Sequence, residues 1–237
     1  IAPGSLQGKG ISFDDGPHPV YTPQILDVLH SEGVHAVFFV VGAQVAAYPN
    51  VLKRIHDEGH EIGNHTYSHT LTEASLERDI SCEISDTSQL VEKLIGSPTK
   101  WVRPVGGALS AAFVRAAEST GHTIVLWNID TQDWRAARSW GRSDEIRLSV
   151  SDTPLANGSV VLMHDGGGYR GATVQALKAI IPALREQGYQ FCTLSELWHF
   201  LGLDASLPHQ KVYLKSATSL PRQEVYLRSD SLPHVVR

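Results

Sequence analysis

Residues 10–17 read Gly-Ile-Ser-Phe-Asp-Asp-Gly-Pro. The first four predict a short strand, and Gly16-Pro17 predicts a turn directly after it. Neighbouring strand residues point to opposite sides, but a backbone that turns at the strand end can bring Asp14 and Asp15 into one cavity. Taken alone, this stretch would more simply be an acidic turn in which one carboxylate caps the next segment.

Short apolar runs and amphipathic stretches alternate along the chain, which is typical of repeated βα units. The predicted strands are residues 10–13, 36–41, 61–63, 101–103, 123–128, 159–163 and 190–193. The predicted helices are residues 23–31 with Thr22 as N-cap, 49–58 with Gly59 just beyond, 76–95, 111–120 and 173–187. This order predicts an α/β fold, a distorted (β/α) barrel of about seven parallel strands, with its chemistry at the carboxyl ends of the strands.

We expect one catalytic domain over residues 1–205 and a short extension over residues 206–237. The extension nearly repeats itself, since residues 206–216 resemble residues 219–229 and a third copy begins at Ser231. These units are too short to form a domain. A tail that packs along the barrel or trails from it is favoured over a binding module.

Bulk composition narrows the classes of partner. The 237 residues carry a net charge of -5, so nothing favours nucleic acid or an anionic membrane as partner, and no apolar run is long enough to span a bilayer. Twelve histidines modestly favour a metal site.

The chain starts at Ile1, which suggests a processed or trimmed form. Cys82 and Cys192 could form a disulfide, but two buried thiols are favoured because Cys192 lies in a strand-like run.

His65 and His69 stand four residues apart, a spacing that brings two side chains to one face of a helix. One carboxylate and two imidazoles can hold a divalent metal and leave positions open for water and substrate. The second carboxylate of the Asp14-Asp15 pair can then act as a base on that water. A pair of ordinary surface or core histidines is the alternative for this spacing.

Three further segments place chemical residues after predicted strands. They are Trp101-Val-Arg-Pro-Val-Gly-Gly107, Ile129-Asp-Thr-Gln-Asp-Trp134 and Val161-Leu-Met-His-Asp165. Singly, Arg103 could be a surface cation, Asp133 a helix cap and His164 a core histidine. With Asp14-Asp15 and the His65–His69 segment, five such groups follow one another at predicted strand ends. Five independent structural roles do not explain this order well.

Together these blocks resemble the polysaccharide deacetylases that share the NodB homology domain, carbohydrate esterase family 4, over about residues 9–200. By that resemblance Asp14 is the catalytic base and His164 the general acid. Arg103 would brace Asp14, and Asp133 would tune His164.

The resemblance also implies a divalent metal, Zn²⁺ or else Co²⁺ or another ion, held by Asp15, His65 and His69. Trp134 and Leu162 would line the acetyl pocket. Trp140, in the loop after the fourth block, could be a platform on which a sugar stacks, or it could pack over the barrel rim.

One block departs from the family's pattern. The family usually follows its arginine with Pro-Pro-Tyr-Gly, whereas this chain has Pro104-Val-Gly-Gly107. Gly106 therefore takes the place of the tyrosine whose backbone N–H helps form the oxyanion hole. A backbone donor survives this replacement, but the groove wall loses an aromatic ring, which bears on rate and substrate range more than on reaction type.

The resemblance implies removal of N-acetyl groups from β-1,4-linked N-acetylglucosamine, in chitin, its oligomers or peptidoglycan, by a secreted or cell-wall-associated enzyme. An O-acetyl esterase on xylan is the first alternative. A member that binds carbohydrate but has lost turnover is the second, and only the altered third block favours it. The three glycines at 166–168 could form an anion nest, but a mobile loop beside His164 is the simpler reading.

Overall fold

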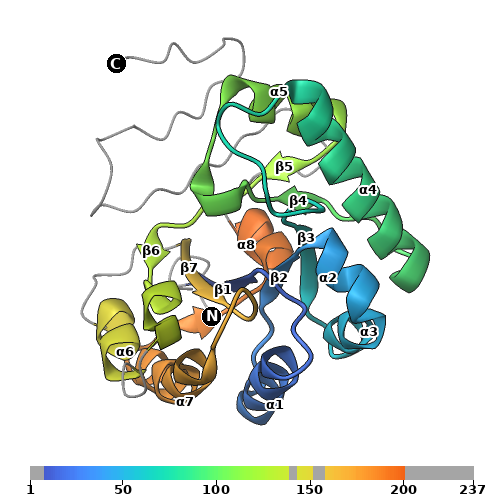
Figure 1. Cartoon of the computed structure of the whole chain (residues 1–237). Coiled ribbons are helices and arrows are strands. Elements are labelled where there is room, and N and C mark those ends of the chain that lie inside the picture. The colour runs from blue at the N-terminus through green and yellow to red at the C-terminus, as the bar shows by residue number, and fades with distance from the viewer. Residues whose placement is uncertain (1–7, 139–142, 152–157, 201–237) are drawn as a thin grey trace, which may run out of the picture.

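The computed structural model describes residues 8–138, 143–151 and 158–200 (Figure 1). The predicted extension at 206–237 and Trp140 lie outside the described residues. Among the described helices, none is long and apolar enough to cross a membrane.

Parallel strands form the centre of the molecule. They are β1 (Gly8–Asp14), β2 (Val37–Val40), β3 (Glu61–Asn64), β4 (Trp101–Val102), β5 (Thr123–Ile124), β6 (Ile129–Asp130), β7 (Ser159–His164) and β8 (Gln190–Phe191). Seven of them pair in the order β5-β4-β3-β2-β1-β7-β6, and β8 pairs with the first residues of β1. Since no pairing within the described chain joins β5 to β6, the sheet is an incompletely closed barrel, which confirms the predicted fold class.

Helices surround this sheet (Figure 1). They are α1 (Tyr21–Glu32), α2 (Gly42–Ala47), α3 (Pro49–Asp57), α4 (Glu77–Ile95), α5 (Ala111–Ser119), α6 (Ser143–Ser151), α7 (Gly171–Glu186) and α8 (Leu194–Phe200), with the 3₁₀ turns η1 (Val105–Gly107) and η2 (Asp133–Arg138). The predicted helices match to within two residues, and Gly59 follows α3 in the left-handed conformation as expected. Thr22 as an N-cap is wrong, because α1 begins at Tyr21 and the Thr22 hydroxyl instead donates to Asp165 at 2.5 Å.

Alternation along the strands decides which side chains face the barrel interior. Ile11 and Phe13 of β1 belong to the large cluster beneath the outer helices, so Ser12 and Asp14 face inward. On β7 Val161 packs into the same outer cluster, whereas Val160 packs into the inner one. Register pairs Asp14 with His164, so both lie at the same level at the carboxyl ends of their strands.

Helix α8 closes the opposite end of the barrel. Leu197 and Trp198 are buried in the inner cluster together with Val37 of β2, and Figure 1 shows α8 in the middle of the ring of strands. The first two backbone N–H groups of α8 donate to the carboxylate of Glu61, the first residue of β3. Access to the interior is therefore from the carboxyl ends of the strands, which we call the mouth.

The predicted strand at 123–128 is wrong in its second half, since β5 ends at Ile124. The carbonyls of Val125 and Leu126 accept hydrogen bonds from Arg103 at 3.0 and 3.2 Å. The chain then reaches the far edge of the sheet, where Asn128 N–H donates to Val160 and β6 pairs with β7. A buried arginine thus replaces a strand ladder at the point where the barrel is open.

Both cysteines are free thiols, so no disulfide joins them. Cys192 is buried as expected, but the expectation of a buried thiol is wrong for Cys82, which is exposed.

Candidate active site

The predicted site residues meet at the mouth of the barrel. Asp14 ends β1 and Asp15 follows it, while His164 ends β7. Gly16 packs against the buried Asp165, because a Cβ at position 16 would lie 2.1 Å from a carboxylate oxygen of that residue. Both carboxylates of the pair reach the same histidine, since Asp14 and Asp15 lie 3.7 and 3.6 Å from Nε2 of His65.

His65 and His69 lie on a loop after β3 and not on a helix, so the predicted helical presentation is wrong. Thr66 and His69 have positive φ angles of 69° and 58°, which fold the loop back on itself. Glu83 of α4 accepts from the backbone N–H groups of Tyr67 and Ser68 at 2.8 and 2.6 Å. The loop conformation, and not a helical turn, brings the two imidazole centroids to within 5.1 Å of each other.

Asp15, His65 and His69 form a group able to hold a metal ion. One ligand atom from each lies within 4.8 Å of the others. The Oδ1 atom of Asp15 is 2.9 Å from Nε2 of His69 and 3.6 Å from Nε2 of His65. Two imidazole nitrogens and one carboxylate oxygen are a ligand set used for catalytic Zn²⁺ and related divalent ions.

The tautomer of His65 fits this role. Its Nδ1 lies 2.8 Å from the carbonyl oxygen of Arg103, which can only accept, so Nδ1 carries the proton. Burial lowers the pKa of His65 and keeps the ring neutral, despite the nearby charges of Asp14 and Asp15. The Nε2 lone pair therefore faces Asp15 and is available to a metal.

The contact between Asp15 and His69 shifts the pKa of both groups. Burial raises the pKa of the Asp15 carboxyl, but the hydrogen bond from His69 and the surrounding histidines outweigh it and hold the pKa well below its usual range. The same hydrogen bond raises the pKa of His69. Without a metal, Asp15 and His69 thus favour each other's charged form at the position where a cation would bind.

Asp14 is buried beside this group and is held by Arg103. Its Oδ1 accepts from the Arg103 guanidinium at 2.7 Å, and its Oδ2 lies 3.7 Å from Nε2 of His65. The guanidinium is fully buried, donates also to the Ser12 hydroxyl at 2.9 Å and lies 3.9 Å from the Phe39 ring centroid. One carboxylate oxygen is therefore fixed, and the other faces the metal group.

His164 pairs with a second buried carboxylate. Its Nδ1 lies 2.6 Å from Oδ1 of Asp133, and Oδ2 of Asp133 accepts from the His164 backbone N–H at 2.9 Å and from the Thr173 hydroxyl at 2.8 Å. Burial lowers the pKa of His164, but the hydrogen bond and charge of Asp133 outweigh it and raise the pKa to about 9. At neutral pH this histidine is a cation whose remaining ring nitrogen is Nε2.

Comparison with known proteins agrees with this geometry. The family model for polysaccharide deacetylases matches residues 8–125. A peptidoglycan-N-acetylglucosamine deacetylase of Bacillus cereus is 39% identical over 192 residues, which are 80% of this chain and 87% of that protein. The chain belongs to the polysaccharide deacetylase family.

Other members of the family give the same picture. A chitooligosaccharide deacetylase of Sinorhizobium fredii is 32% identical over 190 residues, covering 76% of this chain and 86% of that protein. The crystal structure of a peptidoglycan N-acetylglucosamine deacetylase superposes with a TM-score of 0.75 at 37% identity, over 81% of this chain and 88% of that one. The resemblance inferred from the motifs is therefore confirmed.

The residues predicted to bind substrate have different surroundings in this polysaccharide deacetylase. Leu162 is buried on β7, two residues before His164 and on the same face. Trp134 is 45% exposed in the first turn of η2, and the Arg135 guanidinium lies 4.9 Å from its ring. Gly106 in η1 has a φ of 58°, and a Cβ there would meet no atom within 4 Å.

The motifs did not single out four residues that hold this deacetylase's site together. Besides Glu83 and Thr173, these are Asn64, which accepts from Thr66 N–H at 2.8 Å, and Asp165, which is buried at 1% exposure. Burial raises the pKa of Asp165 to about 7. Asn64 and Asp165 are each next to a motif histidine in the sequence, and this position could have marked them as site residues. Glu83 and Thr173 lie on helices, and nothing in the sequence around them indicates a role in the site.

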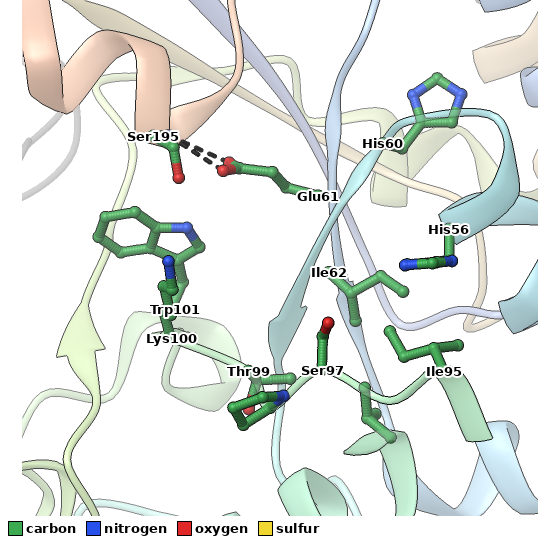
Figure 2. Close-up of a pocket in the computed structure, with 12 residues that line it drawn as sticks. His56, His60, Glu61, Ile62, Ile95, Ser97, Thr99, Lys100, Trp101 and Ser195 are labelled. Carbon is green, nitrogen blue, oxygen red and sulfur yellow. Dashed lines mark hydrogen bonds between the residues drawn. The ribbon is translucent and has the colours of Figure 1, made fainter. Parts of the chain in front are cut away.

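The described chain also has a pocket of about 180 Å³ at the closed end of the barrel, away from the mouth. Figure 2 shows its lining, which includes Glu61 and Trp101 at the starts of β3 and β4 and Ser195 of α8. The Glu61 carboxylate already accepts from the Ser195 backbone N–H. The pocket lies where α3, α4, α8 and the loop before β4 meet the starts of β3 and β4, and its lining includes none of the predicted catalytic, metal-binding or substrate-binding residues.

Proposed function

We propose that this protein is a metal-dependent hydrolase that removes N-acetyl groups from β-1,4-linked N-acetylglucosamine polymers or oligomers, in peptidoglycan or chitooligosaccharides. One observation carries the proposal: a metal-binding group, a spare buried carboxylate and a cationic histidine share the mouth of one barrel. The relatives' names, peptidoglycan-N-acetylglucosamine deacetylase and chitooligosaccharide deacetylase, support this choice of substrate.

Asp15, His65 and His69 would hold the metal, which we propose is Zn²⁺, with Co²⁺ as a competent substitute. When bound, such an ion polarises an acetyl carbonyl and lowers the pKa of water. The remaining chemistry comes from side chains that the chain positions by itself.

Asp14 acts as the general base. Its hydrogen bond from Arg103 fixes Oδ1, which leaves Oδ2 to accept a proton from the attacking water on the side of the metal group. The guanidinium is fully buried and also donates to the Ser12 hydroxyl, so it holds Oδ1 in one position.

His164 acts as the general acid and donates the Nε2 proton to the leaving nitrogen. Asp133 holds the ring through Nδ1, so the proton to be transferred lies on the other nitrogen. The backbone N–H of Gly106 is proposed to donate to the developing oxyanion, a contribution of about 3 kcal/mol for a single donor. Leu162 and Trp134 would line the acetyl methyl pocket.

The paired histidine favours amide over ester hydrolysis. An amine is a poor leaving group without a proton, whereas an alkoxide leaves more readily. A site that keeps His164 protonated through neutral pH is therefore suited to N-deacetylation. Because peptidoglycan and chitin lie outside the cytoplasm, we also propose a secreted or cell-wall-associated protein.

The direct test is acetate release from N-acetylglucosamine oligomers, peptidoglycan and acetylated xylan, using chelator-stripped protein before and after addition of Zn²⁺ or Co²⁺. We expect metal-restored release from at least one of the first two substrates and little from xylan. Release from xylan alone would replace the proposal with an O-acetyl esterase. No release from any of the three, with metal bound, would indicate a carbohydrate-binding member without turnover.

A further inference from the structure

The glycine run after β7 packs against Asp15. A Cβ on Gly167 would lie 2.4 Å from Oδ2 of Asp15, and one on Gly166 would lie 2.2 Å from the backbone oxygen of Asp15. Both distances are far below an ordinary van der Waals contact. Gly166 and Gly167 therefore form a turn seated on a predicted metal ligand.

A buried arginine holds this turn in place. Arg170, at 2% exposure, donates from Nε to the carbonyl oxygen of Gly166 at 2.6 Å. Its Nη2 atom lies 3.3 Å from the position that a Cβ on Gly167 would take. Arg170 precedes α7, so the turn is connected to a helix packed in the main core.

The two oxygens of the Asp15 carboxylate consequently have different surroundings. Oδ1 lies 2.9 Å from His69 and 3.6 Å from His65. Oδ2 lies against the α-carbon of Gly167, where only a residue without a side chain leaves room. The packing of Gly167 against Oδ2 therefore orients the Asp15 carboxylate so that Oδ1 faces the imidazoles of His65 and His69.

We propose that Gly167, fixed by Arg170 through the Gly166 carbonyl, is a positioning residue that turns Asp15 toward His65 and His69 and thereby sets the affinity for the metal. This inference rests on the metal binding in the proposed function, but not on the substrate or on turnover. It gives the glycine run a role in the site: a support for the ligand carboxylate. Groups that orient metal ligands commonly affect affinity by about 10- to 100-fold.

Gly167→Ala is the informative variant. The atom that its methyl would meet is the end of the Asp15 side chain, which can rotate away without a change of fold. Rotation moves Oδ1 from the imidazoles, and this is the displacement that the proposal predicts to weaken binding. Gly166→Ala is a poorer test, because its methyl would meet backbone atoms of Asp15 and Gly16.

Gly96→Ala is the matched control. Gly167 and Gly96 have φ angles of 70° and 74°, so alanine meets the same backbone strain at both positions. A Cβ on Gly96 would meet no atom within 4 Å, and Gly96 caps the far end of α4. The close contact with Asp15, together with the looser one to Nη2 of Arg170, distinguishes the two variants.

The experiment measures Zn²⁺ affinity of the metal-free full chain by calorimetric titration, the visible spectrum of the Co²⁺ form and the melting temperature without metal. We expect Gly167→Ala to bind Zn²⁺ about 10- to 100-fold more weakly than Gly96→Ala and to alter the Co²⁺ spectrum, with similar melting temperatures for the two. Affinities within twofold of each other and unchanged spectra would overturn the proposal.

Arg170→Lys provides a second measurement that does not add a side chain to the turn. Lysine keeps the charge but lacks the Nε–H that donates to Gly166, so we expect a loss of Zn²⁺ affinity of about threefold to tenfold. Unchanged affinity would remove Arg170 from the proposal. If wild-type protein binds Zn²⁺ but releases no acetate, the proposed function fails while the affinity comparison still decides this inference; if it binds no Zn²⁺, both fail.

Discussion

The mouth of the barrel holds two histidine–aspartate groups that use the same residue types in different ways. His65 donates its Nδ1 proton to a neutral backbone carbonyl, so no negative charge lies at that nitrogen, burial lowers the pKa, and Nε2 keeps its lone pair. His164 donates its Nδ1 proton to the buried carboxylate of Asp133, and its pKa rises to about 9. The group that accepts the Nδ1 proton thus distinguishes His65, a predicted metal ligand, from His164, a predicted general acid.

The largest effect is expected on the metal side of this comparison. Asp15→Asn removes the carboxylate charge from the ligand group while keeping the shape of the side chain. We expect loss of Zn²⁺ binding and a fall in acetate release of about 10³-fold or more, corresponding to about 4 kcal/mol of lost transition-state stabilisation. Calorimetric titration and acetate assays measure both, and Asp57→Asn, an exposed carboxylate on α3 beside His56, is the control.

The acid side should respond differently. His164→Ala leaves the metal group intact, so Zn²⁺ affinity should stay within about twofold, while amide hydrolysis falls by about 10²- to 10⁴-fold because the leaving amine lacks a proton donor. Hydrolysis of an activated acetyl ester should fall much less. Near-full amidase activity in this variant would remove His164 from the mechanism, and the exposed His56→Ala is the matched control.

The pH dependence tests the pairing itself. Because the pKa of His164 is raised to about 9, the proton it donates is present below that pH, and kcat/KM should fall as the pH rises through about 9. Asp133→Asn removes the charge that raises this pKa, so the alkaline limb should move to lower pH by at least about one unit. A limb that stays in place would assign it to another group.

The same pair should affect stability in a defined window. The folded-state pKa of His164 lies above the ordinary histidine value, so the pair's stabilisation is complete below about pH 6.5 and is lost as the pH rises through about 9. Urea unfolding at pH 6 and pH 10 measures this difference. Asp133→Asn should abolish it, whereas Asp57→Asn should not.

The smallest effect is expected at Thr173, which acts on the acid only through Asp133. Thr173→Val removes one of the hydrogen bonds to Oδ2 of Asp133 and should reduce kcat/KM by about threefold to tenfold, the value of about 1 kcal/mol for one hydrogen bond. Thr173→Ser keeps the hydroxyl and should restore most of the activity. Failure of serine to rescue the valine variant would indicate a packing role.

The sequence predicted those parts of the molecule that local pattern controls. The strand Gly8–Asp14 and the helix Glu77–Ile95 follow apolar periodicity, and they were found within two residues of their bounds. The group of Asp15, His65 and His69 was also predicted, but through the resemblance of the ordered blocks to the family and not through the spacing of the histidines alone. The predicted backbone conformation of the ligand segment was wrong. A spacing of four residues suggests a helix, and only the hydrogen bonds from the loop to Glu83 show that the segment is a loop.

Other features depend on contacts between distant segments, which no local pattern reveals. Strand β5 stops at Ile124 because Arg103, 21 positions earlier in the chain, occupies the next carbonyls. Thr22 looks like a helix cap, yet its hydroxyl serves a carboxylate 143 residues away. The glycines at 166 and 167 look mobile, and only the position of Asp15 shows why they are small.

Four described residues other than glycine have positive φ angles, and all lie in segments at the mouth: Asp15, Thr66, His69 and Gln132. Such backbone costs about 1–3 kcal/mol per residue, and Thr66 adds a buried hydroxyl without a hydrogen-bond partner. Selection for thermal stability would favour glycine or asparagine at Thr66, whereas selection for activity would keep whichever residue holds the neighbouring imidazoles together. Engineering for stability is therefore better directed at the outer helices, where the two demands do not conflict.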